Sequence, residues 1–204
     1  MNLRVAALSA LCVALAGCAT VSRKVAFDGT EGTSFLLLAA EGLVGGNGYS
    51  YIFRKVDRSS STFQDDKFWL YIAGDSGTLF AKPKTLDSAT TFAGQAVPPG
   101  EYALITRSEY SRYGVSSADG SGCFALGAPI FRIRKGQIQV ISLERGNAVD
   151  IADTKQVEAQ VATVMAAYPN MTAPISMAPV VGHLTFEVDD PNKCNPSGAF
   201  KLVE

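Results

Sequence analysis

Short runs of apolar residues, separated by turns that contain glycine or proline, recur along most of this chain. The runs have the length of β-strands and are rich in the aromatic and β-branched residues that strands favour. Because turn signals recur about every ten residues, the pattern predicts a mostly β protein with mostly antiparallel strands. The runs cover residues 34–40, 49–56, 67–73, 101–107, 129–134, 137–143, 180–188 and 200–203.

Tight turns and strict alternation support this prediction at particular positions. Asn47-Gly48 and Lys135-Gly136 each lie between two runs, where a glycine supplies the backbone conformation that a short hairpin turn needs. Within residues 67–73, one face is expected to hold Phe68, Leu70 and Ile72, and the other face Trp69 and Tyr71.

A helix near residues 154–168 is predicted to interrupt the strands. Asp153 is a suitable N-cap, and Gln156 has the position of its capping-box partner. Many short strands with one late helix favour an antiparallel β-sandwich with an added helix. The apolar stripe of that helix would consist of Val157, Val161, Val164, Met165 and Tyr168.

The first seventeen residues have the layout of an export signal, with Arg4 followed by an apolar run over residues 5–16. A helix over this run would rise about 18 Å, which is short of the roughly 30 Å hydrocarbon core of a bilayer. A cleaved signal is therefore expected rather than a transmembrane anchor.

The end of that run, Leu15-Ala16-Gly17-Cys18, resembles the lipobox of bacterial lipoproteins. The resemblance implies cleavage before Cys18, acylation of Cys18 with palmitate-type chains, and membrane attachment through this N-terminal lipid. In such lipoproteins, an alanine after the lipidated cysteine, as at Ala19, favours transfer to the outer membrane more than an aspartate does. The resemblance therefore implies a protein attached to the outer membrane that faces the periplasm. The alternative is an ordinary cleavable signal in which Cys18 has no role.

Three segments are expected: a signal peptide over residues 1–17, a flexible tether over 18–33, and a single domain over 34–204. The tether is expected because its residues are small and polar with mixed charge. With 47% hydrophobic residues, one core of ordinary size is expected. A formal net charge of −1 without a basic stripe argues against a nucleic-acid partner.

Cysteine usage agrees with export. Cys12 would leave with the signal and Cys18 would carry lipid, so Cys123 and Cys194 are the candidate structural pair. In an oxidising compartment two remaining cysteines usually form a disulfide, and two free buried thiols are the alternative.

Two segments resemble a prealbumin-like β-sandwich. They are VPPGEYAL at residues 97–104 and IFRIRKGQI at residues 130–138. In these segments the chain is similar to bacterial lipoproteins of unknown function that are built on such a domain. The resemblance implies a prealbumin-like or immunoglobulin-like sandwich, and it informs the fold rather than the function.

Gly74-Asp75-Ser76-Gly77 resembles the nucleophile motif of trypsin-like serine proteases. A catalytic serine needs a base and a carboxylate that orients the base. The chain has a single histidine, His183, which follows the serine, whereas that family places its histidine first. A hairpin turn is therefore the preferred interpretation.

No metal or cofactor is expected. Neither a C-x-x-C nor an H-E-x-x-H spacing accompanies His183, which lies in a strand-like segment. The glycine-rich residues 42–48 lack the Gly-Lys-Ser/Thr end of a phosphate loop and favour a hairpin loop. The carboxylate pairs at residues 65–66 and 189–190 are expected in polar loops.

The loop over residues 109–122 is a candidate binding surface, because Tyr110, Arg112 and Tyr113 lie among small polar residues. The alternative is a disordered connection near Cys123.

The sequence thus favours a lipid-anchored, non-enzymatic binding or structural module of the bacterial cell envelope, with an envelope protein or glycan as partner. One alternative is a periplasmic hydrolase that uses Ser76 or a carboxylate pair. Another is a carrier of a small apolar ligand, which would need a cavity inside the sandwich.

Overall fold

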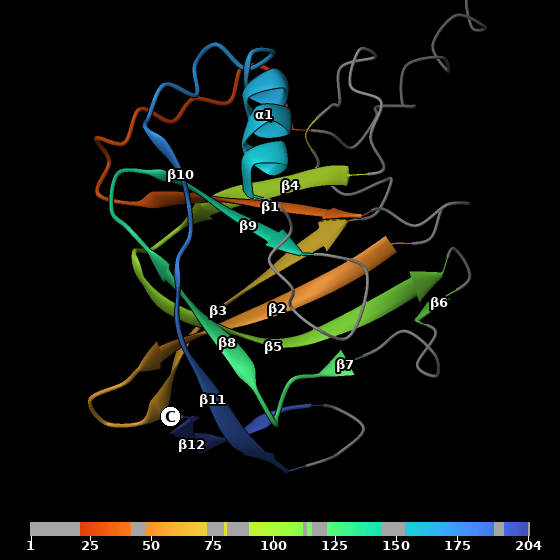
Figure 1. Ribbon diagram of the computed structural model, residues 1–204, viewed down its shortest axis with the longest axis vertical. Helices are drawn as coiled ribbons and strands as arrows, with labels where there is room; N and C mark the ends of the chain where they lie inside the picture. The colour runs from red at the N-terminus through yellow and green to blue at the C-terminus, as the bar shows by residue number, and fades with distance from the viewer. Residues whose placement is uncertain are drawn as a thin grey trace, which may run out of the picture.

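The computed structural model describes residues 21–41, 48–72, 80, 90–111, 114–115, 122–143, 154–189 and 194–203 (Figure 1). These residues are mostly in β-strands, with one helix among them. The elements are β1 (Ser34–Glu41), β2 (Gly48–Asp57), β3 (Thr62–Ile72), β4 (Thr90–Val97), β5 (Gly100–Ser111), β6 (Gly114–Val115), β7 (Gly122–Cys123), β8 (Ala128–Ile133), β9 (Ile138–Leu143), α1 (Thr154–Met165), β10 (Ile175–Met177), β11 (Val180–Val188) and β12 (Pro196–Val203).

The strands form two sheets. The smaller sheet has the order β10–β9–β1–β4, in which β9 is parallel to both β10 and β1, and β4 is antiparallel to β1. The larger sheet is antiparallel throughout and has the order β2–β3–β12–β11–β8–β5, with β6 and β7 added to β5. The mostly antiparallel β fold that the sequence predicts is confirmed.

The larger sheet closes on itself, because β2 pairs with β5 as well as with β3. Six strands, β2, β3, β12, β11, β8 and β5, therefore form a ring. The shortest pairing in this ring is the one between β3 and β12, where Thr62 is paired with Ala199. Register shifts in four of the pairings accompany the curvature of these strands, as bulges do in closed sheets.

The two sheets pack face to face through one hydrophobic cluster. From the smaller sheet, β1 contributes Leu36 and Leu38, which are fully buried. From the larger sheet, Phe53 stacks on Phe68 with 5.0 Å between ring centroids, and Phe68 meets Tyr102 at the same distance. The alternation predicted within residues 67–73 is confirmed, since Phe68, Leu70 and Ile72 are buried in this cluster.

Helix α1 covers the outer face of the smaller sheet (Figure 1). Its buried residues belong to a second cluster with Phe35 and Leu37 of β1, so β1 is buried on both faces. A continuous apolar strand such as SFLLLAA is typical of that position. The helix ends before Tyr168, but the Tyr168 ring is still buried, 4.7 Å from that of Phe80. The expected stripe is confirmed: Val157, Val161, Val164, Met165 and Tyr168 all belong to the cluster.

A third cluster fills the ring of six strands. Phe63 of β3 meets Phe186 of β11 and Phe200 of β12 edge-on, with centroids 5.6 and 5.2 Å apart. A simple pair of sheets would have no such interior, and the local pattern of polar and apolar residues did not indicate it. The remaining members are Val56, Ala103, Ile105, Ala128, Ile130, Leu184 and Cys194.

Part of the segment expected to be a tether is packed against the fold. Phe27 is 5% exposed, accepts backbone hydrogen bonds from Thr172 and Ala173, and donates one to Asn170. Val21 and Val25 pack against the same cluster as α1. The chain is therefore held from Val21 onward, well before β1.

Four of the observed strands were not predicted from the sequence: β4, β6, β7 and β10. The segment TTFAGQAV of β4 gives a weak pattern because most of its residues are small or polar. β6 and β7 have two residues each, and β10 has three residues that lie between Pro174 and Pro179. Within the described residues, no helix has both the length and the apolar character needed to cross a bilayer.

Candidate binding sites

Cys123 and Cys194 form a disulfide, as the sequence predicted, with 5.5 Å between their Cα atoms. The bond joins β7 to the residues just before β12. The sulfur of Cys194 lies 3.3 Å from the carbonyl oxygen of Ile105, inside the ring of strands. Neither sulfur is a thiol that could act as a nucleophile or a metal ligand, so the pair is structural.

Only part of the candidate loop is described. Tyr110 lies on β5, where its Cα position pairs with Gly48 on one side and Val115 on the other. Arg112 and Tyr113 lie outside the described residues, as do Ser76 and Cys18. The contact surface predicted for this loop therefore stays a prediction.

Next to that loop, Arg107 is buried against two tyrosines. Its guanidinium carbon lies 5.0 Å from the centre of the Tyr49 ring, and the residue is 8% exposed. Burial raises the pKa of Tyr51 well above its ordinary value, and the charge of Arg107 opposes that rise. The three side chains lie on the paired strands β2 and β5.

The other titratable candidates are dispersed. His183 is exposed on β11, between Pro129 of β8 and Val203 of β12. In the described part of the chain no three His, Cys, Asp or Glu side chains gather as a metal site would require. The expectation that residues 65–66 lie in a loop was wrong. Both aspartates are exposed within β3, opposite a register shift in β2, and Asp66 forms an ion pair of 3.2 Å with Lys55.

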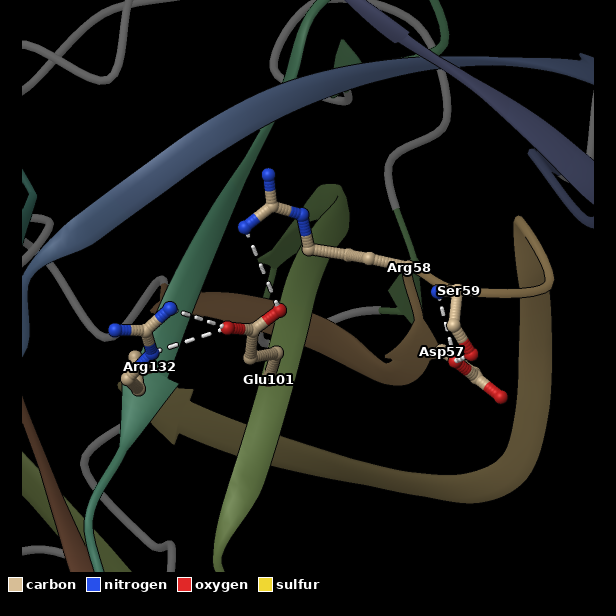
Figure 2. A network of polar contacts seen from close by, with 5 residues as sticks. All are labelled: Asp57, Arg58, Ser59, Glu101 and Arg132. Atoms are coloured by element: carbon tan, nitrogen blue, oxygen red, sulfur yellow. Dashed lines mark hydrogen bonds and ion pairs between the residues drawn. The ribbon is translucent and has the colours of Figure 1, made fainter.

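A charged cluster lies near one end of the β5–β8 pairing (Figure 2). Glu101 and Arg132 are paired across β5 and β8, two residues beyond the inward-facing Ala103 and Ile130. Arg132 donates to one carboxylate oxygen of Glu101 from Nε at 3.0 Å and Nη2 at 2.8 Å. Arg58 approaches the other oxygen at 3.9 Å.

The contacts in this cluster are those of a structural ion-pair network. One carboxylate oxygen of Glu101 accepts two hydrogen bonds from Arg132, and the other lies 3.9 Å from Arg58, which favours a structural role. Beside it, the Ser59 hydroxyl donates to Asp57 at 2.6 Å and lowers the pKa of that carboxyl group. Exposed ion pairs of this kind contribute little to stability.

A short row of exposed aromatic rings lies on the outer face of β3. Trp69 and Tyr71 are 39% and 36% exposed, and the Lys67 ammonium lies 5.3 Å from the centre of the Trp69 ring. Single exposed aromatic residues are common on protein surfaces, and the Lys67 ammonium already lies over the Trp69 ring.

An apolar groove lies between α1 and β10. It has a volume of about 340 Å³ and opens to solvent beside Ile175, which is 42% exposed. Ala162 on α1 leaves space where a larger side chain would close the gap. The lining residues are Val140, Glu158, Val161, Ala162, Ile175, Ser176 and Met177.

The groove was missed in the sequence because it depends on β10. The segment PISMAP has too few residues between its prolines to give a strand signal by periodicity. One feature of the sequence could have indicated this strand. Ile175 and Met177 are apolar residues at alternate positions, as on one face of a strand. The cavity lies outside the space between the sheets, where a ligand carrier was considered.

Comparisons with protein-family models, with curated proteins and with solved structures gave no match for this chain.

Proposed function

We propose that this protein is a lipid-anchored, non-enzymatic binding module of the bacterial cell envelope, attached through Cys18 to the outer membrane and facing the periplasm. Its partner would be another envelope component, protein or glycan. The observation that carries the proposal is Leu15-Ala16-Gly17-Cys18 at the end of an apolar run preceded by Arg4.

Two structural features support this proposal. The Cys123–Cys194 disulfide is the kind of cross-link that persists in an oxidising compartment such as the periplasm. The groove beside β10 offers apolar surface with a polar rim, which suits reversible binding.

The anchor would hold the folded body close to the membrane. Val21 packs against the α1 layer only three residues after Cys18. Three extended residues span at most about 10 Å. The α1 side of the molecule would then stay near the bilayer, with the larger sheet directed into the periplasm.

As part of the proposal we classify the fold as a β-sandwich of the prealbumin-like or immunoglobulin-like kind. The support is the face-to-face packing of the two sheets and a hydrogen bond of 2.9 Å from the Tyr102 hydroxyl to the carbonyl oxygen of Pro98. A tyrosine near the start of a strand that bonds to the backbone just upstream recurs in such sandwiches. The parallel strands and the closed ring are departures from the simple form.

The anchor is tested by metabolic labelling with a palmitate analogue in a bacterial host. Wild-type protein should be labelled and recovered with membranes, and Cys18→Ala should be unlabelled and accumulate as uncleaved precursor. Cys12→Ala is the matched control, because Cys12 lies inside the apolar run and its loss should leave labelling intact. Continued labelling of Cys18→Ala would refute the lipoprotein assignment.

A further inference from the structure

β10 is the outer strand of the smaller sheet, and its far edge is not paired with any described strand. On its near side, the carbonyl of Pro174 accepts from Ile138 at 2.9 Å, and the amide of Ala178 donates to Val140 at 2.8 Å. In a parallel ladder, alternate residues bond to the same neighbour. The backbone groups of Ile175 and Met177 therefore point away from β9, toward the open edge.

The groove lies on the same side of the sheet as these two side chains. Ile175 is in register with Ile138, and Met177 with Val140, and both partners face α1. A strand added along the edge of β10 would place alternate side chains over this apolar floor. A volume of about 340 Å³ is at the lower end for ligand pockets, so it suits one large side chain better than a cofactor.

Glu158 supplies the charge at the rim. It is exposed on α1, it is the single ionisable residue in the lining, and no ion pair to it exists among the described residues. A lysine or arginine on the bound segment would complement this carboxylate, and an acidic residue would be repelled.

We propose that β10 and the groove bind an extended segment of a partner protein by strand addition. An aliphatic or aromatic side chain of that segment enters the groove, and a neighbouring basic residue lies beside Glu158. This inference rests on the binding role in the proposed function and does not depend on the lipid anchor. A second copy of this chain is disfavoured, because β10 has only three residues, whereas a stable interface involves about 20–30 residues and roughly 800 Å² on each side.

The test uses purified full-length protein in detergent and a phage-displayed library of random linear peptides. Selected peptides should be rich in β-branched residues and carry a basic residue near an apolar one. Ala162→Trp fills the groove from an exposed position of α1 and should weaken the selected peptides about tenfold or more. Ala159→Trp is the matched control, since Ala159 is exposed on the same helix but does not line the groove.

Two further readouts separate strand addition from other binding. Peptide binding should slow the hydrogen exchange of the Ile175 and Met177 amides, and Glu158→Gln should weaken the peptides and lower the salt dependence of binding. The proposal is overturned if no peptide is selected, if Ala162→Trp binds as well as Ala159→Trp, or if those amides stay unprotected. It is also overturned if wild-type protein dimerises and Ala162→Trp does not. Failure of Cys18 labelling would remove the anchor and leave this result unaffected.

Discussion

At the scale of single residues, Tyr102 shows how far a side chain can be interpreted from the sequence. The Pro-Pro-Gly-Glu-Tyr string indicated a turn followed by a strand, and β5 begins at Gly100. The string could not show that the tyrosine ring would lie against Phe68 with its hydroxyl on Pro98. That contact depends on how β5 lies against β3, which is set by the packing of the sheets.

Burial raises the pKa of Tyr102 to about 12. The protonated phenol is therefore favoured in the folded state, and its contribution to stability is complete below the ordinary value near 10. As pH rises from about 10 to about 12, the unfolded state loses this proton before the folded state does, so stability falls.

Tyr102→Phe should cost about 1 kcal/mol at neutral pH, because it removes one buried hydrogen bond. The difference from wild type should narrow above pH 10, since phenylalanine has no proton to lose. Urea unfolding of both proteins at neutral pH and above pH 10 measures this. A stability difference that stays constant with pH would contradict the raised pKa of Tyr102. The other tyrosines titrate in both proteins, so their effect on stability cancels in the difference.

At the scale of elements, the long apolar strands and the helix were predictable, and the short or small-residue strands were not. β1 and α1 have strong patterns because each buries a continuous apolar surface. β4 has a weak pattern because its glycine, Gly94, lies directly against β1. A Cβ atom there would lie 2.6 Å from Cε1 of Phe35 and 2.9 Å from the carbonyl oxygen of Leu36.

Gly94→Ala should therefore destabilise the fold by about 1–3 kcal/mol, since β4 or β1 must move to admit the methyl group. Gly127→Ala is the control, because a Cβ at Gly127 would meet nothing within 4 Å. Its effect should stay within about 0.5 kcal/mol of wild type. The measurement is the midpoint of urea unfolding for wild type and the two variants. Equal midpoints for the two variants would contradict the close contact between β1 and β4 at Gly94.

At the scale of the whole molecule, the disulfide links parts that are far apart in the chain. Cys123 and Cys194 are separated by 71 residues, and the bond holds β7 to the start of β12 across the ring of strands. In the chain-entropy account, closing a loop of this length stabilises a protein by about 4 kcal/mol.

Reduction, or the double change Cys123→Ser and Cys194→Ser, should lower the free energy of unfolding by roughly 2–4 kcal/mol. Trp69 is the only tryptophan in the chain and lies half-exposed on β3, so its fluorescence reports unfolding of the larger sheet. The double variant should not respond to reductant. A wild-type unfolding curve that is the same with and without reductant would contradict a stabilising role for the bond.

The sequence by itself determined what depends on neighbours along the chain. It was sufficient for the strand-rich pattern and the helix stripe, because periodicity and turns are local properties. The cysteine pair followed from the small number of candidate cysteines, and the lipobox stays a proposal. Tertiary structure alone decided the closure of the larger sheet, the backbone bridge between Phe27 and Met171, and the groove between α1 and β10. Each of these joins segments that are distant in sequence, and whether they meet depends on the register and packing of strands that no local pattern specifies.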